Sequence, residues 1–117
     1  MIDYVDPIPP VIQMLKPLFT QRIYGNLFPP NIAMPAILIR NAGGNGYTRL
    51  QILVRANSDI DAMQLLIDVM NTLERNASSI QLRGAWIEKE SNPLPDRDEV
   101  TGKYEAWAYM RMEHLEA

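Results

Sequence analysis

Two segments of this chain alternate apolar and polar residues with a period of two, and this pattern restricts the fold more than any other feature. In residues 47–56, Leu50, Ile52 and Val54 fall on one side of an extended strand, and mainly polar residues fall on the other. Residues 102–115 alternate in the same way. Strands of this kind lie in a sheet that has one buried face and one solvated face. We therefore expect a sheet that is covered on one side only.

Two more strands are expected beside these. The apolar run 36–39 predicts a buried strand, and residues 79–90 have the composition of a strand with a bulge or a close approach at Gly84. The four strands then form two hairpins, 36–39 with 47–56 and 79–90 with 102–115. Such hairpins predict a mainly antiparallel sheet.

Helices are expected in two places. Residues 58–75 form the clearest one, because Ser58 and Asp61 have the spacing of a capping box and apolar residues recur along one face. The methionines of that face are typical of a core, and an adaptable binding surface is the alternative. A short, proline-rich helix is predicted over residues 9–19. The fold class is thus α+β: one domain over residues 1–117, with a single layer of about four strands and both helices packed on one face.

Composition limits the classes of function. The chain has no cysteine and one histidine, His114, which excludes a thiolate site and disfavours a zinc site or a Ser-His-Asp triad. The net charge of −3 disfavours a protein that grips nucleic acid through a basic face. We see neither a membrane span nor a signal peptide. We expect no catalytic residue, no metal site, no cofactor and no membrane partner, so the chain is not expected to be an enzyme.

The glycine-rich segment Gly43-Gly44-Asn45-Gly46 is the first candidate contact site. A phosphate-binding loop would lead into a helix, whereas this segment lies between two predicted strands. We interpret it as a hairpin connection whose glycines supply positive φ angles. A tip of small residues can order against a partner, and a simple turn is the alternative.

The outward face of the two alternating strands is the second candidate site. Trp107 and Tyr109 are predicted there beside charged residues, a combination common at protein interfaces. Arg49, Arg55 and Arg111 are expected on the same outward faces, where they predict a polar, partly basic surface. Burial of Trp107 under the N-terminal helix is the alternative.

The acidic, proline-rich segment 91–101 is the third candidate site. It lacks the spacing of a calcium-binding loop, and a solvated loop is the alternative. Its candidate contact residues are Pro93, Pro95, Asp96, Asp98 and Glu99.

The order of these elements resembles that of the tail terminator, or tail completion, proteins of tailed bacteriophages. The resemblance covers about residues 8–114, and the proline-rich start departs from the family pattern. The residues that carry it are Arg22, Ile23 and Tyr24, Pro35 with Ile37 and Ile39, Leu50 and Gln51 before the main helix, and Thr101-Gly102.

The resemblance implies a structural virion protein that forms a homo-oligomeric, usually hexameric, ring. Such a ring caps the tail tube, stops its polymerisation and joins it to the neck of the head. Its partners would be the tail-tube protein and neck or head-completion proteins, and DNA would pass through the lumen without sequence-specific binding. The protein would reside at the tail–neck junction of the virion, and in the host cytoplasm during assembly. The alternatives are a head-closure or neck connector protein and a non-viral small α+β binding module.

Overall fold

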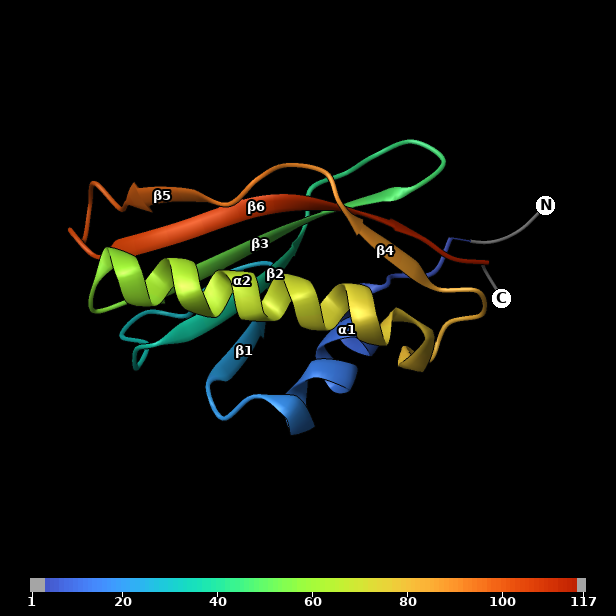
Figure 1. The fold of residues 1–117 in the computed structure, drawn as a ribbon, viewed down its shortest axis with the longest axis horizontal. Coiled ribbons are helices and arrows are strands. Elements are labelled where there is room, and N and C mark those ends of the chain that lie inside the picture. The colour runs from blue at the N-terminus through green and yellow to red at the C-terminus, as the bar shows by residue number, and fades with distance from the viewer. Residues whose placement is uncertain (1–3, 116–117) are drawn as a thin grey trace.

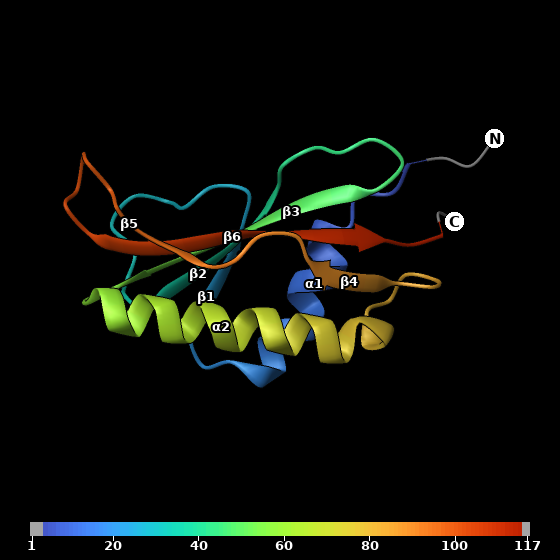
Figure 2. The same cartoon turned by 45° about the horizontal axis from the view of Figure 1, so that its top comes forward.

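The fold is a single sheet with both helices on one side, and the computed structural model describes it for residues 4–115 (Figure 1). The helices are α1 (Ile8–Leu15) and α2 (Asp59–Asn76), followed by the short 3-10 turns η1 (Lys16–Leu18) and η2 (Ala77–Ser79). The strands are β1 (Arg22–Gly25), β2 (Ala36–Asn41), β3 (Thr48–Ala56), β4 (Trp86–Lys89), β5 (Leu94–Arg97) and β6 (Tyr104–Glu113). Figure 2 shows α1 and α2 beneath the sheet.

The sheet is mixed and has six strands, not the four that we expected. Its order is β1-β2-β3-β6-β4, and β5 pairs with the other half of the same β6 edge. β1 runs parallel to β2, and the remaining pairs are antiparallel. The α+β class with helices on one face is confirmed. The two additional strands, β1 and β5, have four residues each, which is too short for an alternating pattern to identify them.

The predicted strand 79–90 is shorter than expected, and its bulge lies elsewhere. Only Trp86–Lys89 is a strand, and Gly84 lies in the turn before it. The bulge falls between β4 and β5, where the N–H groups of Glu90 and Ser91 both donate to the carbonyl of Tyr109, at 3.0 and 3.1 Å. The N–H of Tyr109 donates to Ser91 Oγ at 2.9 Å. A side-chain hydroxyl thus replaces a main-chain acceptor where the edge strand bends.

The core lies between the helices and the alternating faces of β3 and β6. Leu50, Ile52 and Val54 are fully buried, and across the ladder Ala106 lies opposite Val54 and Ala108 opposite Ile52. Because these alanines are small, α2 packs closely over the middle of the sheet. The methionines of α2 take part in this core: Met70 is buried and Met63 packs against it.

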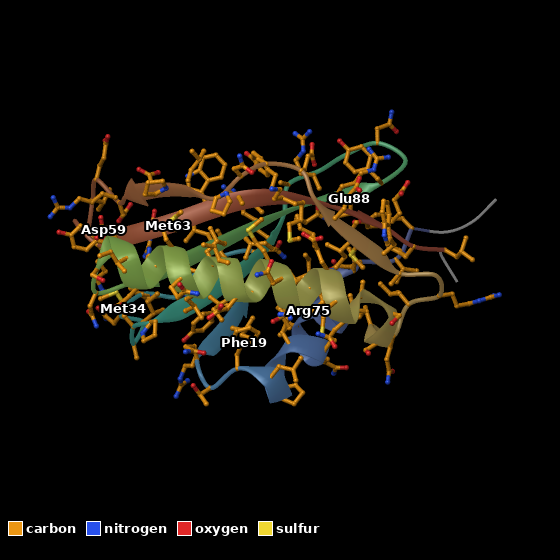
Figure 3. The ribbon with its side chains drawn as sticks, in the orientation of Figure 1. Phe19, Met34, Asp59, Met63, Arg75 and Glu88 are labelled. Carbon is orange, nitrogen blue, oxygen red and sulfur yellow. The ribbon has the colours of Figure 1, made fainter. Side chains whose placement is uncertain are left out.

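The ends of α2 follow the sequence signals. Ser58 Oγ accepts a hydrogen bond from the N–H of Asp61 at 3.1 Å, which confirms the predicted cap. Asp59 and Arg75 lie at opposite ends of the helix, where each complements the helix dipole (Figure 3). Within residues 4–115, no helix has both the length and the apolar character needed to cross a bilayer.

We expect Ser58→Ala to lower the free energy of unfolding by about 1 kcal/mol, because the first turn of α2 loses its side-chain acceptor. Urea denaturation at neutral pH measures the change. Ser78→Ala, at an exposed position in η2, is the matched control and should leave stability unchanged. Equal stability of the two variants would contradict a capping role.

Candidate functional site

The sheet face opposite the helices, here called the open face, carries most of the predicted interaction residues. Trp107 and Tyr109 are both half-buried on it, and their rings meet edge to face with centroids 5.3 Å apart. Both helices lie on the other side of the sheet, so Trp107 is not buried under α1. The open-face residues of β3 and β6 face each other in four pairs: Arg49 with Arg111, Gln51 with Tyr109, Leu53 with Trp107, and Arg55 with Glu105.

Each of the three arginines predicted for this face is held by an aromatic ring and an acid. The Arg49 guanidinium lies 5.2 Å from the Tyr109 ring centroid, and its Nη2 lies 2.7 Å from Glu90 Oε1. The hydrogen bond that Arg49 donates to Glu90, together with the negative charge of Glu90, raises the pKa of Arg49 above the ordinary value. Arg111 lies 3.9 Å from the Tyr47 ring centroid and 3.4 Å from Glu113 Oε1. Acids thus balance the charges of these three arginines, contrary to the expectation that they make the face basic.

Arg55 is the centre of a more buried cluster at the far end of the open face. Its Nε donates to the carboxylate of Glu105, which is only 7% exposed. Its Nη2 lies 3.8 Å from Asp98 Oδ2, and its guanidinium lies 4.8 Å from the Phe28 ring centroid. A buried carboxylate needs such a partner, since an unpaired charge there would be strongly destabilising. The cluster joins β3, β6, the β5–β6 turn and the loop after β1.

Segment 91–101 is not one loop, contrary to expectation. Pro95 and Asp96 lie within β5, whose side chains are all exposed, and Pro93 precedes that strand. Asp98 begins the turn to β6, and exposed Glu99 follows it. The missed strand is explained by its two neighbouring prolines, which the edge of a sheet tolerates. Among residues 4–115, no three His, Cys, Asp or Glu side chains are grouped to hold a metal.

Asp98 shapes the turn that follows β5. Its Oδ2 accepts hydrogen bonds from Thr101 Oγ1 at 2.5 Å and from the N–H of Thr101 at 3.0 Å. The side-chain hydrogen bond from Thr101, followed by the main-chain one, lowers the pKa of Asp98 below its ordinary 3.8. Hydrogen bonds to an ionised carboxylate thus stabilise the turn.

The glycine-rich segment is the connection between β2 and β3, as predicted. Gly43, Gly44 and Gly46 have positive φ angles, and exposed Asn45 lies at the tip. The N–H of Arg49 donates to the carbonyl of Gly43 at 2.8 Å. The connection ends in Tyr47, whose ring lies against Arg111, so the tip continues into one end of the open face.

The structure gathers some predicted site residues and separates others. The open face brings together the two aromatic and three arginine candidates, with the Gly43–Gly46 tip at one end and Asp98 at the other. Pro93, Pro95, Asp96 and Glu99 lie along the β5 edge and its turn. The sequence did not reveal the partners of the arginines. These partners are Phe28, Tyr47, Glu90 and Glu105. Only Glu105, which alternates in step with Trp107, had a sequence signal that placed it on this face.

Comparison with known proteins assigns the chain to no family. No protein-family model matches the chain, and no curated protein matches it.

The turn at Asp98 should make stability depend on pH. Its pKa is lowered in the folded chain, so the ionised carboxylate stabilises the fold above about pH 4, and that contribution disappears as the pH falls through the lowered pKa. We expect Asp98→Asn to be less stable than the native chain at pH 7, and the difference to shrink by pH 3. Urea denaturation at both pH values measures this. Glu99→Gln, at the neighbouring exposed acid, is the control; equal pH dependence of Asp98→Asn and the native chain would contradict the assignment.

Gly44 and Gly46 provide a test of the hairpin geometry. A Cβ at Gly44 would clash with the carbonyl oxygen of Tyr47, whereas a Cβ at Gly46 would meet nothing within 4 Å. We expect Gly44→Ala to cost about 2 to 3 kcal/mol, and Gly46→Ala about 1 kcal/mol from backbone strain alone. Thermal and urea denaturation compare the two variants, and equal losses would show that the tip rearranges freely.

Proposed function

We propose that this protein is a phage tail terminator: a structural subunit that assembles into a ring, caps the tail tube and connects it to the neck. The open face is the observation that carries the proposal. The helices bury one side of the sheet and leave Trp107 and Tyr109 half-exposed on the other, beside arginines fixed in place. Trp, Tyr and Arg are the residues that contribute most to protein–protein binding.

The way the arginines are held supports docking of protein rather than phosphate. A side chain that is stacked and ion-paired is already ordered, so a partner that binds it loses little conformational entropy. Arg49 and Arg55 already have carboxylate partners, which weakens their attraction for a phosphate backbone. A surface of this kind suits a ring through which DNA passes without being retained.

The distribution of charge supports the same proposal. Four acids and one arginine give α2 a net charge of −3. The whole chain has the same formal charge, so acidic and basic residues outside α2 are equal in number. The negative charge is thus concentrated on one helix, on the side of the sheet away from the open face. The subunit has two chemically distinct sides, as a ring with different neighbours above and below requires.

The test is the mass of the purified protein by light scattering, alone and with the tail-tube protein of the same phage, with negative-stain images of the large species. Hexameric rings, free or on tube ends, support a terminator. Rings of another copy number that ignore the tube would indicate a head-closure or neck connector protein. A monomer or dimer at every concentration would overturn the ring and favour a small binding module.

We expect Trp107→Ala to weaken assembly more than folding. Its ring is half-buried, so its loss should cost about 1 to 2 kcal/mol of unfolding free energy, and docking should lose a central aromatic contact. The measurements are melting temperature and the fraction of tube ends that carry a cap. Ile60→Ala, at an exposed position in the first turn of α2 on the other side of the sheet, is the control. Capping at the native level, with a lowered melting temperature, would make Trp107 a residue of the fold alone.

A further inference from the structure

We propose that the sheet continues from one copy of this chain to the next, with β1 of one subunit pairing antiparallel with β4 of its neighbour. The inference deepens the proposed function, on which it rests, by naming the two surfaces that meet in the ring. It depends on which main-chain groups at the sheet edges are free, and on which side chains those edges present.

The outer edge of β1 is open. At the end of the β1–β2 ladder, the N–H of Asn26 donates to the carbonyl of Ile39 at 2.9 Å. In a parallel ladder alternate residues bond to the neighbouring strand, so Tyr24 also bonds to β2. The residues between, Ile23 and Gly25, therefore direct their N–H groups away from the sheet. A groove of about 470 Å³ runs beside this edge, lined by residues of α1 and β1.

The outer edge of β4 is open in the same sense. The N–H of Glu90 donates to the carbonyl of Tyr109, which fixes the alternation of the β4–β6 ladder. Trp86 and Glu88 then bond to β6, and Ile87 and Lys89 direct their main-chain groups outward. Glu88 lies on β4 at this border of the sheet (Figure 3).

The β5 half of that border is closed to a further strand. Pro95 has no N–H, and the N–H of Arg97 donates to Asp96 Oδ1 at 2.7 Å. These two residues occupy alternate positions in β5, so both donors on one side of the strand are removed. Proline and charged side chains are common protection for an exposed edge. Protection of β5 beside an unprotected β4 indicates that the β4 edge is the one that pairs.

One register satisfies both edges. When Ile23 faces Ile87, their outward main-chain groups meet, and both side chains lie on the helix side of the sheet. On the open-face side the same register places Arg22 opposite Glu88 and Tyr24 opposite Trp86. Trp86 is 49% exposed, and among residues 4–115 neither Arg22 nor Glu88 has an ion-pair partner. A shift by two residues would set Tyr24 against Glu88, and the aromatic pair would be lost.

The strand directions agree with this pairing. β1, β2 and β6 run in one direction, and β3 and β4 run in the opposite direction. A neighbouring copy with its strands aligned to the first therefore brings β4 antiparallel to β1. The two edges lie at opposite borders of the sheet, so the contact is head-to-tail, and successive copies close a ring when the rotation between them fits.

The experiment uses the absence of cysteine from the chain. Arg22 and Glu88 would form a non-hydrogen-bonded antiparallel pair with Cα atoms about 4.5 Å apart, within reach of a disulfide. We expect the double variant Arg22→Cys/Glu88→Cys, oxidised under assembly conditions, to give a ladder of linked subunits on a non-reducing gel, up to the copy number of the ring. Arg22→Cys/Lys89→Cys is the matched control, because Lys89 points to the other face; it should give no ladder.

A charge exchange provides a second readout. Arg22→Glu or Glu88→Arg alone should raise the concentration for half-assembly about fivefold per contact, and the double exchange should restore it. Assembly without a ladder and without this rescue would overturn the edge pairing and leave the proposed function standing. A chain that stays monomeric at every concentration, with and without the tube protein, would overturn both.

Discussion

The antiparallel pairing of β3 with β6 is the constraint on which the rest of the structure depends. It joins nine residue pairs whose members lie 48 to 64 positions apart in the chain, and it holds two alternating strands in step. Because both strands keep their apolar residues on the same side, one register determines where the core lies and which face stays open. Ala106 and Ala108 on that ladder let α2 pack closely, and the β6 border receives β4 and β5. A slip by one residue would turn one strand over relative to the other and place its apolar residues on the open face.

The elements that could be predicted are those with a long periodic signal. β3, β6 and α2 were recognisable because each repeats its pattern several times, and Ser58 marks the start of α2. β1 and β5 are too short to repeat, and β5 contains a proline that normally argues against a strand. The bulge at Glu90 and Ser91 exists because a hydroxyl meets the N–H of Tyr109 across the ladder, a contact that no local pattern records.

The candidate site was predicted in position but not in electrostatic character. Alternation alone placed Arg49, Arg55 and Arg111 on the outward face. Glu90, which lies at the bulge, neutralises Arg49, and two rings from loops, Phe28 and Tyr47, stack on the other two arginines. Loop positions follow from tertiary packing, so the sequence predicted free cations where the fold places ordered, paired ones. That difference favours docking of a folded partner over binding of phosphates.

The place of β6 in the sheet has a consequence for biosynthesis. Of the described strands β6 follows all the others in the chain, yet it lies between β3 on one side and β4 and β5 on the other. While a ribosome is still making the protein, β4 and β5 therefore have no neighbour to pair with, and α2 has only part of its sheet to cover. The sheet can be completed only after β6 has been synthesised. A prematurely ended chain would lack the strand that holds β4 and β5 in place, so it could not complete the sheet.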